Sequence, residues 1–425
     1  MTRFRAIAVA VVVGLPLVAC GTTAQTAVSP ERDAAARISA DLQFLADDAR
    51  EGRGVGTQGL EQAAAYIARA FQDIGLRPGG TDGYFQPFEL DPRSPALAHT
   101  QLGGERVKNV IGVLPGRGHL ASQVVVIGAH YDHLGLGTRG YIGFSRDTTG
   151  INVVHNGADD NASGTTALLE TARNLARRQT PTHRTVVFVA FTAEELGTIG
   201  AMYYVEHPTL PTDSAIAMVN FDMVGRMSGD SVIVGGTGSA PELVPLLEST
   251  NARYRLNLVK QDDPWGSSDH AVFYGKETPV LHFYTNLHAD YHTPADDWEK
   301  INVDGIVEIV ALASDLVWAM ATQTERMTYV AVSRPERTAG PRASLGTVPD
   351  MVTPGEGMRV QAVRAGTAAD EAGLKAGDVV LRIGDVEVKD IYGLQKALTT
   401  YKTGDTVTIV FLRDGERKET IATLK

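Results

Sequence analysis

The sequence predicts an α/β protein with a mainly parallel, twisted sheet flanked by helices, followed by a small α+β domain. Between residues 123 and 285, four short runs rich in Val, Ile and Phe alternate with segments of helical periodicity. Runs that are apolar at almost every position suit strands covered on both faces. After residue 344 the chain changes to short strands, glycine turns and a helix. We therefore expect two domains.

Helical segments precede and separate the predicted strands. Ala34 to Leu45 and Leu60 to Ile74 carry apolar residues at helical spacing, and the second ends in the helix stop GLRPGG. The predicted strands follow as QVVVIGAH, RTVVFVAFTAEE, IAMVNFDM and TPVLHFYT. The helices between and after them are Thr165 to Arg178, Ala240 to Arg253 and Val303 to Ala321. Ligands of such sheets gather beyond the carboxyl ends of the strands.

The amino terminus has the pattern of an export signal. Residues 1–20 begin with two arginines and continue into an apolar run that is shorter than the roughly 20 residues of a spanning helix. The ending LVAC before Gly21 resembles a bacterial lipobox, which implies a lipid anchor on Cys20 at the bacterial cell envelope, on the periplasmic face or cell surface. An ordinary cleaved signal is the alternative. Residues 21–33 then form a tether.

Charge and cysteine content exclude several classes of function. The formal net charge of −11 argues against nucleic-acid binding, which needs basic patches to meet phosphates. Cys20 is the only cysteine, so no intrachain disulfide forms and no thiolate is available in the globular part as a metal ligand or nucleophile.

Acidic and imidazole side chains follow each predicted strand. His130 and Asp132 follow the first strand, Glu194 and Glu195 the second, and Asp222 the third, while DYHTPADD follows the fourth. Any one of these has an ordinary explanation, such as a surface histidine or acids that begin a helix. Four in succession instead predict a shared site at one edge of the sheet.

Such a site requires a cation, because converging carboxylates repel one another unless a positive charge neutralises them. Histidine and carboxylate without thiolate suit zinc and also admit manganese or cobalt. Two metals about 3.5 to 4 Å apart need a bridging ligand, which a carboxylate provides. HNGADDNASG, at residues 155–164, offers one, although this stretch is also typical of a surface turn.

Six motifs occur in an order that resembles the co-catalytic dizinc aminopeptidases, relatives of bacterial leucyl aminopeptidase and of glutamate carboxypeptidase. The motifs are HYDH, GADDNASG, TAEELG, NFDMVG, SSDHAVF and YHTPADD. The resemblance covers Ala34 to Ala321, and AREGRGVGTQG and AAAYIARAFQDIGLRP resemble the family's amino-terminal helical region. It implies two zinc ions.

The resemblance also implies five metal ligands. The family pattern selects Asp160, rather than Asp159, as the bridging carboxylate. The other implied ligands are His130 and Asp222 for one metal, and Glu195 and His292 for the second.

Further residues receive roles by the same resemblance. Glu194 would act as the general base, Asp132 would orient the imidazole of a ligand, and Tyr291 would donate to the developing oxyanion. We interpret the other histidines as structural or cleft-lining, and Asp269 as supporting. Asp296 and Asp297 are expected to cap the following turn.

The carboxyl-terminal segment resembles a PDZ domain of the kind attached to bacterial envelope proteases. AADEAGLKAGDVVLRIGD carries most of the resemblance, and SLGTVP lies where the carboxylate-binding loop is expected. The domain would bind a carboxyl-terminal peptide, or it would only pack on or gate the catalytic unit. We place the catalytic domain at residues 34–325, the linker at 326–343 and the PDZ domain at 344–425.

The predicted function is that of an exported metallo-aminopeptidase that removes amino-terminal residues from peptides by a water activated by two metals. A carboxypeptidase or glutaminyl cyclase on the same scaffold is the alternative among enzymes. Outside enzymes, the alternative is a receptor-like binding protein that lost catalysis.

Overall fold

The computed structural model describes residues 30–97, 100–137, 145, 152–210, 214–333, 343–350, 356–389 and 391–425. The predicted signal peptide and Cys20 lie outside the described residues, as do most of the tether and half of the linker.

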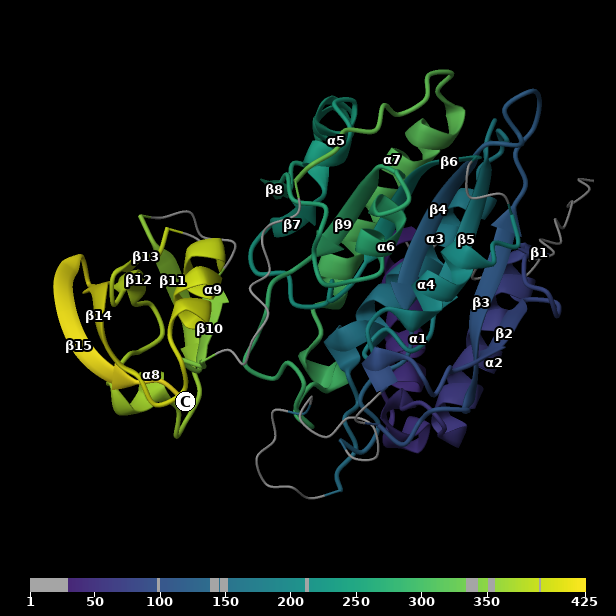
Figure 1. Ribbon diagram of the computed structural model, residues 1–425. Coiled ribbons are helices and arrows are strands. Elements are labelled where there is room, and N and C mark those ends of the chain that lie inside the picture. The colour runs from purple at the N-terminus through teal and green to yellow at the C-terminus, as the bar shows by residue number, and fades with distance from the viewer. Residues whose placement is uncertain are drawn as a thin grey trace, which may run out of the picture.

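The larger domain contains a sheet that runs through its centre (Figure 1). Within the described residues the sheet has nine strands, in the spatial order β1-β3-β5-β4-β6-β9-β7-β8, and β2 pairs with β3. Their bounds are β1 (Arg77–Pro78), β2 (Phe85–Glu89), β3 (Arg106–Leu114), β4 (Val124–His130), β5 (Thr185–Phe191), β6 (Ala215–Phe221), β7 (Ser231–Gly235), β8 (Asn257–Gln261) and β9 (Val280–Tyr284). The central strands β5, β4, β6 and β9 are parallel, whereas β3 and β7 join them antiparallel. The predicted α/β class is therefore confirmed.

Helices cover both faces of this sheet. They are α1 (Pro30–Leu45), α2 (Gln58–Ile74), α3 (Gly164–Ala176), α4 (Ile199–Glu206), α5 (Leu243–Asn251), α6 (His270–Tyr274) and α7 (Val303–Thr322). Every residue of β4, β5 and β6 is buried, as their continuous apolar runs predict. The predicted helices Leu60 to Ile74 and Val303 to Ala321 correspond to α2 and α7, with ends shifted by one or two residues at most.

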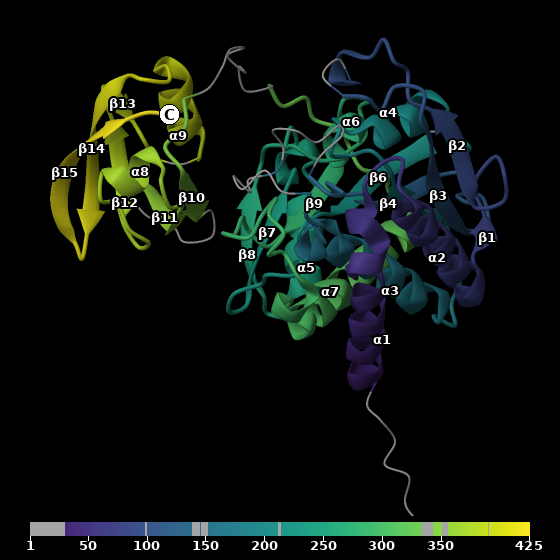
Figure 2. The ribbon, with the colours of Figure 1, turned by 90° about the horizontal axis from the view of Figure 1, so that it is seen from below.

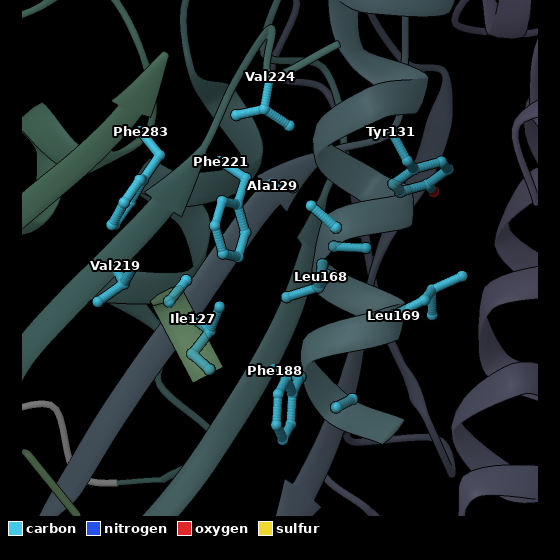
Figure 3. Packing of buried hydrophobic residues seen from close by; sticks show 14 of the residues in the cluster. Ile127, Ala129, Tyr131, Leu168, Leu169, Phe188, Val219, Phe221, Val224 and Phe283 are labelled. Atoms are coloured by element: carbon cyan, nitrogen blue, oxygen red, sulfur yellow. The ribbon is translucent and has the colours of Figure 1, made fainter. Parts of the chain in front are cut away.

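Side chains alternate along the central strands between two cores. Ile127 and Phe188 belong to the core that α1, α2, α3 and α7 cover, where they lie near Leu168 (Figure 3). Val126 and Val187, one residue away on the same strands, belong to the core under α4 and α6. This period of two explains why these strands show no polar face.

Helix α7 is a core helix. Among the described residues it is the one helix long and apolar enough, by length and composition, to cross a membrane. Of that apolar stretch, 61% is buried inside the domain, with Ile309, Leu312 and Leu316 in the larger core. Its apolar composition is therefore explained by packing.

The smaller domain has an antiparallel sheet and a core of its own (Figure 2). Its strands are β10 (Thr347–Asp350), β11 (Met358–Val363), β12 (Val379–Ile383), β13 (Val386–Glu387), β14 (Thr406–Arg413) and β15 (Glu416–Thr423), and its helices are α8 (Ala368–Glu371) and α9 (Ile391–Thr400). The order is β10-β11-β12-β14-β15, with β13 beside β12. The predicted SLGTVP loop leads into β10, an edge strand that pairs with β11.

Candidate metal centre and active site

The carboxyl ends of β4 and β6 bring together the first group of possible metal ligands. His130 is the last residue of β4, and Asp222 follows β6 directly. The Nε2 atom of His130 lies 3.4 Å from Asp160 Oδ1 and 3.4 Å from Asp222 Oδ1. All three residues are buried, and one donor atom of each lies within 4.8 Å of the other two. This spacing suits a single cation.

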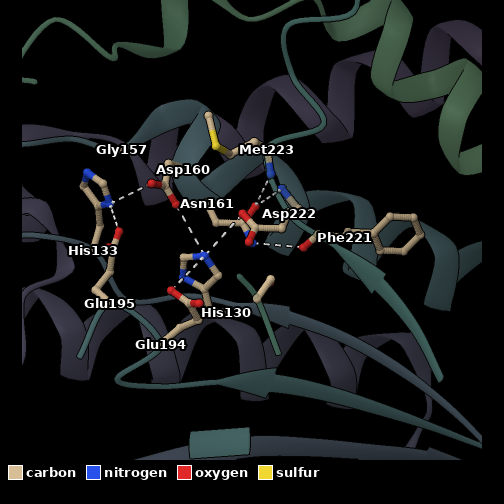
Figure 4. Close-up of polar contacts among 12 residues, drawn as sticks. His130, His133, Gly157, Asp160, Asn161, Glu194, Glu195, Phe221, Asp222 and Met223 are labelled. Atoms are coloured by element: carbon tan, nitrogen blue, oxygen red, sulfur yellow. Dashed lines mark hydrogen bonds and ion pairs between the residues drawn. The ribbon is translucent and has the colours of Figure 1, made fainter. Parts of the chain in front are cut away.

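A second group lies on the other side of Asp160 (Figure 4). His133, Asp160 and Glu195 are buried and also place one donor atom each within 4.8 Å of one another. The Nδ1 atom of His133 is 2.6 Å from Glu195 Oε1. His292, which the resemblance implies as a ligand here, has its Nε2 atom 3.1 Å from Asp160 Oδ2 and 3.2 Å from Glu195 Oε2. Asp160 thus belongs to two groups that could hold two metal ions.

His133 is the residue of this site that sequence reasoning did not select. We predict a structural or cleft-lining role for it, and in the structure it faces the same pair of carboxylates as His292. The second histidine of HYDH was visible in the sequence. Its distance from Glu195 depends on the bend of the chain after β4, which no motif spacing reports.

Charges in this pocket fit a dication. Burial raises the pKa of Asp160, but hydrogen bonds from His130 and His292 hold it well below its ordinary value. Burial lowers the pKa of His130, but the carboxylates of Asp222 and Glu194 raise it well above its ordinary value. The neighbouring carboxylates therefore favour the protonated form of the surrounding imidazoles. A metal ion would take the place of those protons.

The loop that carries Asp160 is attached to the end of β6 by its amides and hydroxyl. It is η3 (Ala158–Ser163), a π-helical turn. Asn161 accepts from Met223 N at 3.2 Å and donates to Phe221 O at 3.0 Å, on both sides of Asp222. Ser163 Oγ accepts from Val224 N at 3.0 Å. The polar residues of ADDNAS therefore fix the position of Asp160 relative to Asp222, two candidate ligands.

Gly157 permits this loop to approach the other candidate ligands. Its φ is +53°, and a Cβ there would lie 2.1 Å from Asp160 O and 2.4 Å from the His133 ring. Any side chain at this position would push the loops that carry Asp160 and His133 apart.

Asp159 is placed differently from Asp160. It is fully buried, and its Oδ1 accepts from Gly225 N at 2.6 Å while its Oδ2 lies 3.1 Å from His288 Nε2. These contacts make Asp159 a structural neighbour of the bridging candidate, and it belongs to neither group of donors found among the described residues.

Asp296 supports the same loop. We expected it to cap the following turn, but its Oδ2 accepts from the backbone N–H groups of Asp159 and Asp160 at 2.9 and 3.1 Å. Its Oδ1 accepts from Arg226 Nη2 at 2.9 Å. Asp297 accepts from Asn156 Nδ2 at 3.0 Å and makes no side-chain cap of η6 (Trp298–Lys300).

The adjacent glutamates have contrasting environments. Burial raises the pKa of Glu194 well above its ordinary value, with Asp269 and Asp222 adding to the shift while His130 opposes it. Burial and Asp160 also disfavour charge on Glu195, but His292 and His133 prevail and lower its pKa to about 2. Glu194 Oε2 lies 3.9 Å from His130 Nε2, beside the first group without belonging to it.

Asp132 holds both glutamates by the backbone. Its Oδ1 accepts from Glu194 N at 3.1 Å and its Oδ2 from Glu195 N at 3.4 Å. The Nδ1 atom of His130 lies 3.2 Å from the backbone O of Asp132 and 3.8 Å from Asp132 Oδ1. The carbonyl therefore orients the ring, which leaves Nε2 to face Asp160 and Asp222.

Tyr291 and Asp269 border the site. The Tyr291 ring lies 3.9 Å, between centroids, from the ring of His292. Asp269 is fully buried, and this burial raises its pKa to about 8. His130 opposes the shift, whereas the acids Asp222 and Asp132 add to it. Neither of its oxygens has a hydrogen-bond partner in the part of the chain that the structure describes.

We expect two zinc ions per chain, because the two donor groups share one carboxylate. Protein purified without chelator and then reconstituted with zinc should show near-equal occupancy of two sites by elemental analysis. A single tightly bound ion in fully active protein would contradict this expectation and favour a cyclase-like enzyme.

Two protein-family profiles and several known proteins match parts of this chain. The profile of "Peptidase family M28" matches residues 109–317, and that of "PDZ domain" matches residues 337–424. Aminopeptidase YwaD of Bacillus subtilis is 30% identical over 226 residues, which are 50% of this chain and 43% of the relative. Leucine aminopeptidase 1 of Emericella nidulans is 26% identical over 229 residues, which are 50% of this chain and 55% of the relative. The chain spans about half the length of these relatives.

Solved structures share the fold. The zinc aminopeptidase BSAP from Bacillus subtilis aligns with a TM-score of 0.54 at 18% identity, covering 68% of this chain and 95% of that one. A Zn-dependent exopeptidase from Parabacteroides distasonis aligns with a TM-score of 0.53 at 19% identity, covering 68% and 97%. These likenesses show the fold, and the two profile matches identify a domain of peptidase family M28 at residues 109–317 and a PDZ domain at residues 337–424.

Proposed function

We propose that this protein is an exported zinc aminopeptidase that hydrolyses the amino-terminal residue of peptides. The observation that carries the proposal is the pair of donor groups that share Asp160, with the carboxylate of Glu194 beside them. The names of the M28 relatives, which include aminopeptidases from a bacterium and a fungus, support the choice of reaction.

Five residues would hold the metals. His130, Asp160 and Asp222 surround one position, and Asp160, Glu195 and His292 surround the other, with His133 as a further candidate there. When bound, the metals would supply positive charge that polarises the scissile carbonyl and acidifies water. A donor set of imidazole and carboxylate without thiolate suits zinc and admits manganese or cobalt.

Glu194 would move the proton. Burial and neighbouring acids raise its pKa, and a carboxylate of raised pKa accepts a proton from the attacking water more readily than an ordinary one. The same carboxyl would then pass that proton to the leaving amine. Asp132 would hold Glu194 in place by accepting from the backbone N–H of Glu194, and Tyr291, whose ring lies beside that of His292, would donate to the oxyanion.

A substrate comparison tests this function. Metal-reconstituted protein should hydrolyse aminoacyl substrates and leave amino-blocked versions of the same compounds intact. Hydrolysis of the blocked compounds from their carboxyl end would indicate a carboxypeptidase, and release of ammonia from an amino-terminal glutamine would indicate a glutaminyl cyclase. Absence of all three reactions in protein that holds two metals would favour a receptor-like binding protein.

We also propose that Cys20 carries a lipid that holds the enzyme at the bacterial cell envelope. The lipobox pattern of residues 17–20 supports this proposal. Cys20→Ser should shift the protein from the membrane fraction to the soluble fraction, and unchanged fractionation would contradict it.

The PDZ domain is expected to be dispensable for small substrates. Deleting residues 344–425 should leave hydrolysis of aminoacyl substrates within about twofold of the full chain, because no proposed metal ligand lies beyond His292 and the small domain has its own core. Cleavage of longer peptides should fall more. If the shortened chain is folded by circular dichroism but inactive on small substrates, the PDZ domain is part of the active unit.

A further inference from the structure

A buried guanidinium joins the two loops that carry the metal ligands. Arg53 ends η1 (Asp48–Arg53), far in sequence from every predicted ligand, and its side chain is fully buried. Its Nε donates to Tyr131 O at 2.8 Å, and its Nη1 donates to Leu45 O and Asn156 O at 2.7 Å each. Its Nη2 donates to Gly157 O at 2.8 Å. Three of these bonds connect the chain beside His130 to the chain just before Asp160, and the bond to Leu45 O ties both to the end of α1.

The backbone around Arg53 strengthens the same connection. His133 N donates to Arg53 O at 3.2 Å, and Gly135 N donates to Gly52 O at 3.1 Å. Arg53 itself has φ of +48°, a conformation that a side chain seldom adopts without support from its surroundings. A Cβ at Gly52 would lie 2.4 Å from His155 O, so this segment is pressed against the ligand loops.

The charge of Arg53 also matters to the acids. The four side-chain hydrogen bonds described above all go to backbone carbonyls rather than to carboxylates. Burial lowers the pKa of Arg53 to about 10, although Asp132, Asp160, Asp296 and Glu195 oppose the shift. Arg53 therefore stays protonated at neutral pH, and its charge reduces the repulsion among carboxylates that must lie close together.

We propose that Arg53 is a positioning residue that sets the distance between the His130 and Asp160 loops and thereby determines the affinity of both metal sites. The inference rests on the proposed two-metal site. It assigns to the AREGRG segment a role at the metal centre, although the protonated guanidinium of Arg53 has no lone pair with which to coordinate a metal.

The chain offers a matched control in Arg184. Its side chain is also fully buried and donates to backbone carbonyls, here Met320 O at 3.0 Å, Thr324 O at 3.0 Å and Glu325 O at 2.9 Å around the carboxyl end of α7. The ionisable neighbours that affect its pKa are Arg326 and Glu325, neither of which is a proposed ligand. Removing Arg184 therefore reproduces the loss of a buried guanidinium without touching the ligand loops.

The experiment compares the full-length protein with Arg53→Met, Arg53→Lys and Arg184→Met. Zinc affinity is measured by competition with a chromophoric chelator, the geometry of the bound site by the visible absorption of the cobalt form, and folding by thermal melting of the metal-free proteins.

Both methionine variants should melt at a lower temperature than the wild-type protein. Zinc affinity should fall at least about 10-fold at both sites in Arg53→Met only, since loss of residues that orient metal ligands typically costs 10- to 100-fold. The zinc affinity of Arg53→Lys, which keeps the charge but not the planar guanidinium, should lie between those of the wild type and Arg53→Met. Its cobalt form should show an altered absorption spectrum.

Several outcomes would overturn the proposal. Wild-type zinc affinity in folded Arg53→Met would do so, as would equal losses of affinity in Arg53→Met and Arg184→Met. If Arg53→Met does not fold, Arg53→Lys with wild-type affinity and cobalt spectrum would count equally against it. A wild-type protein that binds two metals but hydrolyses no aminoacyl substrate would overturn the proposed function and leave the role of Arg53 standing. Wild-type protein that binds fewer than two zinc ions would overturn both.

Discussion

Glu194→Gln should bind both metals and lose about 10²- to 10⁴-fold in turnover, the usual contribution of a general base. The amide keeps the size of the side chain but does not accept the proton of the attacking water. Metal binding should persist because Glu194 lies beside the first donor group and is not one of its members. Elemental analysis and the rate on an aminoacyl substrate, measured on the same sample, check both parts of the expectation.

Glu195→Gln is the paired control. The carboxylate of Glu195 lies within 3.2 Å of His292 and within 2.6 Å of His133, so its loss should weaken the second metal site itself. Added zinc should restore part of the activity of this variant, and none in Glu194→Gln. Equal metal loss in the two variants would mean that base and ligand have been confused.

Asp160→Asn should empty both metal sites together. Each oxygen of this carboxylate faces a different group, Oδ1 toward His130 and Oδ2 toward His292, so the amide would leave two cations with one fewer negative charge between them. We expect more than about 100-fold weaker binding at both sites, since even residues that only orient ligands cost 10- to 100-fold. Metal stoichiometry across a zinc titration measures the effect.

Asp159→Asn provides the contrast. Its carboxylate is bonded to Gly225 N and His288, so the amide should lower the free energy of unfolding by about 1–3 kcal/mol while two metals remain bound. Circular dichroism establishes folding in both variants. Should Asp159→Asn lose both metals while Asp160→Asn keeps them, the assignment of the bridge is off by one residue.

The four central parallel strands are readable in the sequence because burial on both faces leaves an uninterrupted apolar signal. The runs predicted as strands became β4, β5, β6 and β9. The edge of the sheet did not give such a signal. Residues of β8 are exposed or only partly buried, and NLVKQ resembles a loop in composition.

The site was readable where the chemistry of a side chain is itself the signal. Acids and histidines at strand ends could be recognised one by one, and the structure brings all five implied ligands together. Residues that support the ligands cannot be recognised from their side-chain chemistry alone. Asp296 acts by accepting two backbone N–H groups and Arg53 by donating to four carbonyls, and both depend on how distant segments meet in three dimensions.

The distribution of the ligands along the chain has a consequence for folding. The implied ligands come from the ends of β4, β5 and β6, from η3 and from the segment after β9, so the unfolded chain holds them far apart and offers the metals no preformed site. Each metal ion would act as a reversible cross-link between these segments, adding about 4 kcal/mol when free metal exceeds its dissociation constant a thousandfold. Resistance of the protein to proteolysis should then rise with free zinc over the same range as occupancy. Zinc supply would thus set how long the protein survives as well as how fast it works.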